Sequence, residues 1–280
     1  ALIFYKDKPT GRSGQTASPR FEGAMNATVP VLETQDLTIR FGGHVAVNKV
    51  TCAFQPGTLT AIVGPNGAGK TTYFNLISGQ LAASAGQVLI RGKDVTRLPA
   101  SARTQRGLGR AFQLTNLFPN LTVFENIRLA VQARAGAGLS LFTLWTDRRD
   151  LMHAAGVILE RVRLADKRDT VAGALPHGDQ RKLEIALLIA LEPDVFMFDE
   201  PTAGMSMDEV PNVLEIIGEL KRDASKTILL VEHKLDVVRS LAGRIIVLHN
   251  GALVADGEPA EVMASSIVRE AYLGQDFEDA

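Results

Sequence analysis

The stretch GPNGAGKT, residues 64–71, constrains this chain more than any other part of its sequence. It fits the pattern G-x-x-x-x-G-K-[ST] and lies between a β-rich run, TLTAIVG, and a segment with helical spacing, KTTYFNLISG. In such a loop the glycines let backbone N–H groups point inward, and the helix that starts near Gly69 adds its positive N-terminal end. The pattern therefore predicts a strand–loop–helix unit that holds phosphates.

Two side chains of this loop have distinct expected roles. Lys70 supplies a point charge for the β- and γ-phosphates of a nucleotide, and the Thr71 hydroxyl can ligate Mg²⁺. The remaining positions expected to contact the nucleotide are Gly64, Pro65, Asn66, Gly67, Ala68, Gly69 and Thr72. The alternative is a tight glycine-rich turn with an exposed lysine. It is disfavoured, because it requires that the phosphate-loop pattern occurs by chance and also falls between a strand and a helix.

A second candidate element is VFMFDEP, in which a buried strand ends in two carboxylates. Open α/β sheets bind ligands at the carboxyl edge of their strands. Asp199 is suited to hold Mg²⁺ directly or through water, and Glu200 is suited to polarise a water for attack on the γ-phosphate. An acidic pair at a strand end is otherwise a solvated turn, but the upstream phosphate loop favours the catalytic interpretation.

The order of apolar patterns predicts an α/β fold. Short apolar runs separated by turns at 31–54, and QVLIRGKDV at 87–95, are typical of antiparallel strands. The pattern is helical from about 116 to 175, and strand and helix signals alternate afterwards, which implies a mostly parallel sheet. We therefore expect a core with an antiparallel β subdomain at 31–112 and 176–274, an inserted α-helical subdomain at 113–175, and a tail at 275–280.

Composition excludes several classes of protein. The 280 residues carry a formal net charge of −1, so no overall positive charge indicates nucleic acid. The lone Cys52 cannot form an internal disulfide, which suits a reducing compartment, and no apolar run is long enough to span a membrane. Residues 1–25 lack the apolar core of a signal peptide, and we expect a non-native leader or disordered tail before a single domain at 26–280.

Five motifs follow one another in a characteristic order: GPNGAGKTT, FQ at 112–113, LPHGDQRKLEIA, VFMFDEPTAG and VEH at 231–233. With these motifs the chain resembles the ATP-binding cassette (ABC) family from about residue 31 to residue 274. The resemblance implies a P-loop NTPase core, Mg-dependent ATP hydrolysis, and two cassettes that clamp two ATP molecules head to tail. A plain P-loop kinase or GTPase has no reason to carry LPHGDQ.

The resemblance also implies roles for single residues. Phe41, in IRFGG, matches the aromatic residue that stacks on adenine. Gln113 matches the glutamine that senses Mg²⁺ and the attacking water, and His233 matches the switch histidine that contacts the γ-phosphate. Without the resemblance, Phe41 is a buried strand residue, and His233 is a capping or core histidine.

LPHGDQ matches the signature motif, which in this family contacts ATP bound to the other cassette. Its members are Leu175, Pro176, His177, Gly178, Asp179 and Gln180. Pro176 brings neither a hydroxyl nor a backbone N–H, and Asp179 repels a phosphate unless it faces away as a helix cap. The D-loop is Ala203, Gly204, Met205 and Ser206, where Ser206 replaces the family's aspartate and puts its contact between subunits in doubt.

Further stretches resemble the ATPases of branched-chain amino acid importers, namely FGGHVAVNKV, RAFQLTNLFPNLTVFENI, EPTAGMS and VREAYLG. This resemblance implies a subunit that is cytoplasmic and peripheral on the inner face of the membrane. It implies three kinds of partner: a second cassette, identical or paralogous, transmembrane permeases and, indirectly, a solute-binding protein. Within 113–130, Leu117, Phe118, Leu121 and Phe124 either receive a permease segment or form subdomain core.

Other functions stay open at this point. Urea importers share much of the pattern, so the cargo is less constrained than the mechanism. A soluble cassette ATPase of DNA repair or translation is disfavoured, because the chain has one phosphate loop, no sustained heptads and near-neutral charge. A regulatory module that has lost hydrolysis is the third alternative, and it rests on the signature substitutions.

Overall fold

The structure, a computed structural model, describes residues 29–111, 117–136, 149–266 and 268. Residues 1–25, Gln113 and the tail at 275–280 lie outside the described residues. Cys52 is buried, and burial raises the pKa of its thiol to about 12, so it behaves as a small apolar residue. No helix in the described ranges combines the length and apolar character that a membrane span needs.

The N-terminal strands form an antiparallel sheet, as the sequence predicts. Its strands stand in the order β2-β1-β4-β5 and have the bounds β1 Leu32–Phe41, β2 His44–Phe54, β4 Ala85–Ile90 and β5 Lys93–Asp94. The Gly42–Gly43 turn joins β1 to β2, and Gly42 adopts a φ of 58° that favours glycine. The tip of this hairpin, from Phe41 to His44, is exposed.

The second sheet is parallel except at one edge. Its order is β10-β9-β3-β8-β7-β6, and the strands are β3 Leu59–Val63, β6 Leu108–Ala111, β7 Val195–Asp199, β8 Thr227–Val231, β9 Arg244–His249 and β10 Ala252–Gly257. Only β10 pairs antiparallel. Strands β3 and β8 are buried at every position, because layers cover both faces of the sheet.

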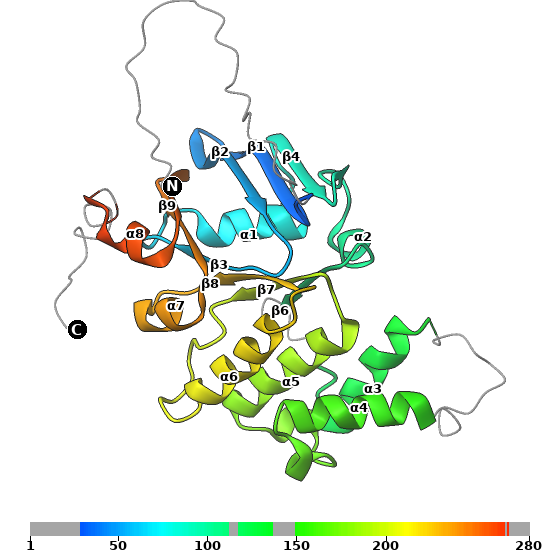
Figure 1. Cartoon of the computed structure of the whole chain (residues 1–280). Coiled ribbons are helices and arrows are strands. Elements are labelled where there is room, and N and C mark those ends of the chain that lie inside the picture. The colour runs from blue at the N-terminus through cyan, green and yellow to red at the C-terminus, as the bar shows by residue number, and fades with distance from the viewer. Residues whose placement is uncertain (1–28, 112–116, 137–148, 267, 269–280) are drawn as a thin grey trace, which may run out of the picture.

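Helices complete the layers on both sides of this sheet. Helix α1 (Lys70–Ser78) lies between the two sheets, and α5 (His177–Leu191), α6 (Val210–Lys221) and α7 (Leu235–Leu241) lie on the opposite face (Figure 1). The remaining short helices are α2 (Ala100–Thr104) and α8 (Pro259–Ala264). This alternation confirms the predicted α/β architecture.

The inserted part of the chain is helical in its described residues. Helix α3 (Val123–Arg134) and helix α4 (Arg149–Arg161) pack against each other and against α5, at the side of the molecule away from the antiparallel sheet (Figure 1). A capping box between Thr122 and Glu125 starts α3. Two 3₁₀ turns, Ala165–Lys167 and Ala172–Ala174, lead into α5. The predicted subdomain boundaries themselves stay a prediction.

Candidate functional site

The phosphate loop joins the buried strand β3 to helix α1, and its backbone admits only glycine at two points. Gly64 has a φ of 150°, and a Cβ there would lie 2.1 Å from the Leu248 carbonyl oxygen. Gly69 has a φ of 97°, and its Cβ would lie 2.5 Å from the Ala46 carbonyl oxygen. The loop is therefore pressed against β9 and β2, which fixes its shape.

Lys70 points back into this loop from the first position of α1. Its side chain is buried, and Nζ donates hydrogen bonds to the carbonyl oxygens of Gly64 at 2.6 Å and Pro65 at 2.9 Å. Burial lowers the pKa of Lys70, while Glu200 and Asp199 act in the opposite direction. The lysine thus lies within electrostatic reach of both predicted carboxylates. Thr71, on the same turn, is exposed.

Asp199 ends β7 and forms a buried ion pair with Arg110 on the neighbouring strand β6. Arg110 Nη2 lies 2.8 Å from Asp199 Oδ2, and the two side chains are 6% and 8% exposed. Burial raises the pKa of Asp199, and Arg110 counteracts this shift. Nη1 of Arg110 donates to three oxygens at the end of α1, those of the Asn75, Ser78 and Gln80 side chains.

The sequence analysis missed Arg110, although it lies in the quoted stretch RAFQ. No sequence signal identifies its partner, because the pairing with Asp199 depends on β6 lying next to β7. Arg110 ties the end of the strand that carries Asp199 to the helix that carries Lys70.

Glu200 and His233 meet at the carboxyl edge of the parallel sheet, where the loops after β7 and β8 emerge side by side. His233 Nε2 lies 2.6 Å from Glu200 Oε1, and both side chains are about two-fifths exposed, at 41% and 38%. Glu200 adopts a left-handed φ of 51°, and its N–H donates to the Val231 carbonyl oxygen at 2.9 Å. His233 is therefore neither a core nor a capping histidine, and it faces the predicted general base.

Phe41 lies at the exposed tip of the first hairpin, with half of its surface (50%) accessible. It is not a buried strand residue, and its ring is free to stack on a ligand. Gln113 lies outside the described residues, so its predicted position beside the metal stays a prediction.

The signature turn begins helix α5. Pro176 is the N-cap residue, where its missing N–H removes no helical hydrogen bond, and Gln180 N donates to its carbonyl oxygen at 3.0 Å. Leu175 is buried, and its carbonyl oxygen accepts from Gln180 Nε2 at 3.0 Å. His177 is exposed at the first helical position.

Asp179 lies in the first turn of α5, and it is paired with two lysines rather than capping the helix. Its buried carboxylate contacts Lys167 and lies 2.9 Å from Lys182 Nζ. Burial alone would raise the pKa of Asp179, yet the two lysines outweigh it and hold the pKa below its ordinary value. The charge of Asp179 is therefore compensated by two lysines of the same chain.

The D-loop residues contact the signature turn within this chain. Ser206 donates to Glu209 Oε2 from its hydroxyl at 3.0 Å and from its N–H at 3.3 Å. The Glu209 carboxylate lies directly over Gly178, because a Cβ there would come within 2.1 Å of Glu209 Oε1. A Cβ on Gly204 would contact the His177 ring at 3.4 Å. Ala203 and Gly204 are exposed, and Met205 is half-buried.

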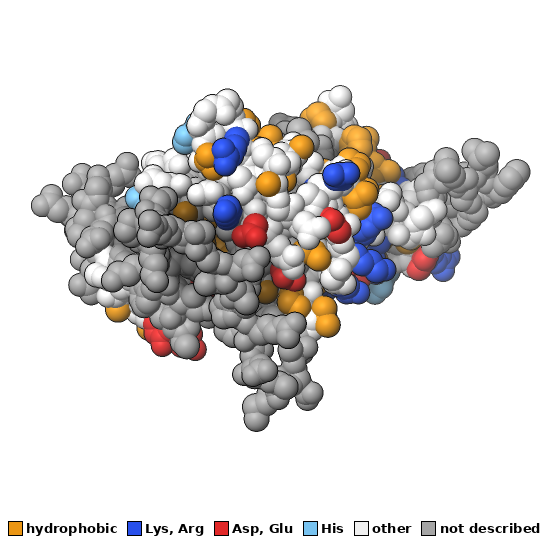
Figure 2. All heavy atoms as spheres, turned by 90° about the horizontal axis from the view of Figure 1, so that it is seen from above, with side chains coloured by type: hydrophobic (Ala, Val, Ile, Leu, Met, Phe, Trp, Pro, Cys, Tyr) orange, Lys and Arg blue, Asp and Glu red, His pale blue; other side chains and the backbone are white. Residues whose placement is uncertain are grey.

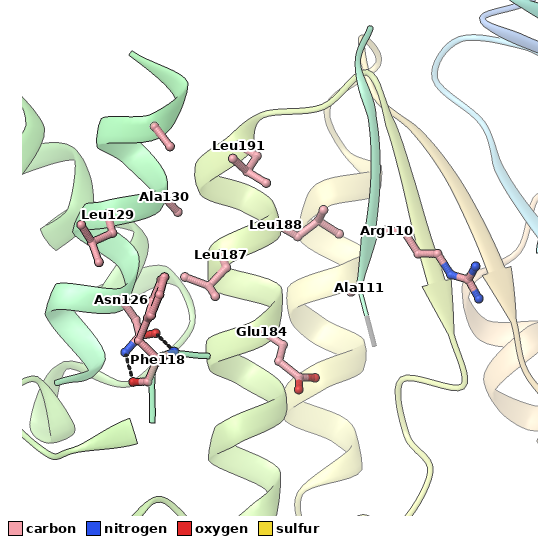
Figure 3. A pocket seen from close by; sticks show the side chains of 11 residues that line it. Arg110, Ala111, Phe118, Asn126, Leu129, Ala130, Glu184, Leu187, Leu188 and Leu191 are labelled. Atoms are coloured by element: carbon pink, nitrogen blue, oxygen red, sulfur yellow. Dashed lines mark hydrogen bonds between the residues drawn. The ribbon is translucent and has the colours of Figure 1, made fainter. Parts of the chain in front are cut away.

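A separate cavity of ≈ 410 Å³ opens between α3, α5 and the end of β6. Its wall is mostly apolar: Leu129, Ala130 and Leu187 lie on the side of Phe118, Leu188 and Leu191 lie farther along α5, and the Arg110 side chain extends away from them (Figure 3). Phe118 is 55% exposed, and Asn126 holds its backbone through two hydrogen bonds, of 2.8 and 3.1 Å.

The four apolar residues of 113–130 thus divide into two groups. Phe124 is buried in the helical core, and the partly buried Leu117 packs against it. Leu121 is partly buried. Phe118 alone among the four presents a large exposed surface.

Among the described residues, the surface over the antiparallel sheet carries charges of both signs. Figure 2 shows Lys and Arg side chains in the middle of this face and toward its right-hand side, with Asp and Glu side chains among them.

Known proteins resemble this chain over most of its length. The family described as ABC transporter matches residues 47–203, and the family described as Branched-chain amino acid ATP-binding cassette transporter matches residues 252–278. The High-affinity branched-chain amino acid transport ATP-binding protein LivG of Escherichia coli K12 is 36% identical over 251 residues, 88% of this chain and 98% of LivG.

More distant relatives and solved structures agree with this similarity. The Lipopolysaccharide export system ATP-binding protein LptB of Escherichia coli K12 is 30% identical, across 88% of this chain and 98% of LptB. A crystal structure of the ADP conformation of an ATP-binding cassette of an ABC transporter has a TM-score of 0.75 at 29% identity, and the match covers 89% of this chain and 100% of that chain.

Proposed function

Because this chain belongs to the ABC transporter family and is an ATP-binding, ATP-hydrolysing subunit, we propose that it powers the import of branched-chain amino acids. The observation that carries the ATPase function is the meeting of Lys70, Asp199, Glu200 and His233 at one sheet edge. The match of residues 252–278 to the branched-chain amino acid transporter family supports the cargo.

Nucleotide binding follows from the shape of the phosphate loop. The backbone of 64–69 and the N-terminus of α1 face the phosphates, and Lys70 exchanges its two carbonyl partners for phosphate oxygens. Phe41 stacks on the adenine ring from the hairpin tip. These assignments come from the family resemblance together with the exposure of Phe41 and the burial of Lys70.

Mg²⁺ is the metal that the donor set fits. Asp199 and the Thr71 hydroxyl offer hard oxygen ligands, and Mg²⁺ is typically held by one or two carboxylates together with substrate phosphates. Asp199 Oδ2 is engaged by Arg110, which leaves Oδ1 as the carboxylate oxygen for the metal or its water. When bound, the metal supplies charge stabilisation for the phosphates, and Gln113 is the third proposed ligand.

In hydrolysis, Glu200 polarises the attacking water and accepts its proton. His233, 2.6 Å from the Glu200 carboxylate, holds this side chain in position and turns toward the γ-phosphate. The left-handed backbone at Glu200 and its bond to Val231 fix the direction in which the carboxylate leaves the sheet. Catalysis of phosphoryl transfer at such a site depends on how these groups are positioned, and the protein forms no covalent bond to the phosphate.

A second cassette completes the site. The signature residues 175–180 contact ATP held by the other chain, and binding of two nucleotides joins the two cassettes until hydrolysis separates them. Pro176 at the N-cap leaves the backbone N–H groups of the first turn of α5 available, which supports an active motif. The signature departures Pro176 and Asp179 are thus accommodated in the fold of one chain.

The cavity between α3 and α5 is the proposed docking place for a short helix of the permease. Its apolar leucines and the exposed Phe118 suit the apolar face of a helix, and Asn126 keeps Phe118 in place. Docking there would hold the protein on the inner face of the membrane. Replacement of Phe118 by Glu should lower co-purification of the permease at least about tenfold, and co-purification unchanged from wild type would contradict this placement.

The ATPase function is tested by comparing wild type with Glu200→Gln. Wild type should hydrolyse Mg-ATP, and Glu200→Gln should hydrolyse at least about a hundredfold more slowly while forming a dimer with ATP in analytical ultracentrifugation. Wild-type turnover equal to that of Glu200→Gln would favour the regulatory module. A Glu200→Gln protein that stays monomeric at saturating ATP would contradict the shared site.

The cargo is tested on the assembled transporter. The permease and solute-binding protein that co-purify with this chain should bind leucine or isoleucine in isothermal titration calorimetry and should stimulate its ATPase when that amino acid is present. Selective binding of urea or an amide would establish the alternative importer. A complex without any solute-binding protein would favour a cassette that is not coupled to uptake.

A further inference from the structure

Glu232 is a buried carboxylate to which the proposed function assigns no role. It follows strand β8, directly before His233, and is 3% exposed. One of its oxygens accepts a hydrogen bond from the Thr202 hydroxyl. The other accepts the backbone N–H groups of His233 at 2.8 Å and Lys234 at 3.3 Å.

The way this charge is held is unusual for a buried acid. A buried carboxylate is costly unless it is paired or fully hydrogen-bonded. Within the described ranges, no Lys or Arg side chain forms an ion pair with Glu232, so the compensation comes from the hydroxyl and the two amides. Charge-assisted hydrogen bonds of this kind are stronger than neutral ones and hold their partners closely.

These bonds join two loops that both carry proposed functional residues. Thr202 is 2% exposed and lies in the loop after β7, between Glu200 and the D-loop residues 203–206. His233 lies in the loop after β8. Because β7 and β8 are adjacent and parallel, with Asp199 opposite Val231, the two loops leave the sheet side by side.

Three separate links connect these loops. The first is the backbone bond from Glu200 to Val231, and the second is the contact between the His233 ring and the Glu200 carboxylate. The third is the Thr202–Glu232 bond, which alone joins the base of the D-loop to the backbone of the switch histidine.

We propose that Glu232 is a positioning residue that couples the D-loop to His233, an inference that rests on the proposed function. A displacement of residues 203–206 moves Thr202, and Thr202 moves the Glu232 carboxylate together with the amides of residues 233 and 234. The distance between the His233 ring and Glu200 changes as a result. A contact that the second cassette makes with the D-loop is thereby conveyed to the hydrolytic pair through one carboxylate.

The test removes the link without removing either catalytic group. Thr202→Val keeps the shape of the side chain and removes the hydroxyl. Glu232→Gln removes the charge and replaces one of the two acceptor oxygens by an NH2 group that cannot accept, which breaks the link at one end. The matched control is Thr227→Val, which deletes a buried threonine hydroxyl, bonded to the Gln55 carbonyl oxygen, at the opposite end of β8. Steady-state kinetics and amide hydrogen exchange are measured on all variants.

We expect Thr202→Val to lower kcat roughly tenfold with the KM for ATP within about twofold, and to accelerate exchange of the His233 and Lys234 amides. The double variant Thr202→Val/Glu232→Gln should be no slower than Glu232→Gln alone, because both changes break the same link. Thr202→Ser, which restores the hydroxyl, should restore kcat. Thr227→Val should keep wild-type kcat and wild-type exchange at residues 233 and 234.

Two results would overturn the coupling. Equal slowing of Thr202→Val and Thr227→Val would mean that both act only through stability, and additive losses in the double variant would mean that no shared link exists. If Thr202→Val does not fold, Glu232→Gln and Thr202→Ser are compared by kcat and by amide exchange at residues 233 and 234. A Glu232→Gln protein that matches Thr202→Ser in both would overturn the coupling. Failure of the proposed function is a distinct outcome, because wild type itself would then show no Mg-ATP turnover.

Discussion

Replacement of Arg110 by Met should destabilise the protein strongly, because it leaves the Asp199 carboxylate buried without its cation. Only 6% of the Arg110 side chain and 8% of the Asp199 side chain are exposed, and Arg110 makes three further hydrogen bonds to the end of α1. Removal of one member of a buried ion pair typically costs about 3–5 kcal/mol of unfolding free energy. We expect Arg110→Met to fall in this range.

The double variant separates the ion pair from the rest of the Arg110 contacts. In Arg110→Met/Asp199→Asn both charges are gone, so the loss should shrink to about 1–2 kcal/mol, with a coupling energy of about 2 kcal/mol or more. The matched control is Arg134→Met, because Arg134 pairs with Glu192 at the surface, where the side chains are 47% and 52% exposed. That pair should contribute less than about 1 kcal/mol.

Urea unfolding followed by far-UV circular dichroism at pH 7 measures the free energy of unfolding of wild type, Arg110→Met, Asp199→Asn, the double variant and Arg134→Met. The reasoning is refuted if Arg110→Met costs no more than Arg134→Met, since the buried pair would then contribute no more than a surface pair. It is also refuted if the double variant loses the sum of the two single losses, because Arg110 and Asp199 would then act independently.

Three further predictions follow from the site. Asp179→Asn should destabilise the protein most at neutral pH, as urea unfolding at several pH values measures. Because the pKa of Asp179 is held low, its contribution to stability is present above about pH 4 and is lost as the pH falls through the folded-state pKa. Gly69→Ala should lower stability by more than Gly67→Ala in thermal unfolding, since both have left-handed backbones but only Gly69 would press a Cβ against a carbonyl oxygen. Phe41→Ala should weaken binding of a fluorescent ATP analogue by about 1 kcal/mol, whereas Phe41→Trp keeps the affinity and both variants keep wild-type stability, because Phe41 is half exposed.

The sequence could predict the parts of the site that lie within one short segment. The phosphate loop at 64–71 and the carboxylates after β7 each follow from a local pattern, a strand followed by a turn with the required residue types. The order of strand and helix signals was enough for the layered α/β architecture as well. Local patterns suffice where backbone geometry and chemistry come from neighbouring residues.

The sequence could not predict side-chain pairs whose members come from distant segments. Arg110 reaches Asp199, and Thr202 reaches Glu232, only because the strand order places β6, β7 and β8 side by side. For a single chain without related sequences, many strand orders satisfy the same apolar patterns. A lone arginine in RAFQ or a lone glutamate before a histidine has no signature of its own.

The orientation of Asp179 shows a different limit. Its residue type suggested a helix cap, since aspartate is favoured at helix starts. Pro176 occupies the N-cap position instead, so Asp179 lies three residues later in the first turn, where its side chain contacts Lys167 and Lys182. The N-cap position of α5 depends on where the chain leaves the preceding 3₁₀ turn, Ala172–Ala174, and that depends on tertiary packing rather than on residue type.

The unusual residues of the D-loop and the signature turn contact one another through Glu209. An aspartate at position 206 would set a second carboxylate against Glu209, whereas Ser206 donates two hydrogen bonds to it. Glu209 in turn fills the space over Gly178 that any larger residue would need. Serine at 206, glutamate at 209 and glycine at 178 therefore depend on one another, and they join the D-loop to the signature turn of the same chain. Because a D-loop displacement then acts on both the signature turn and Thr202, we expect these two segments to move together.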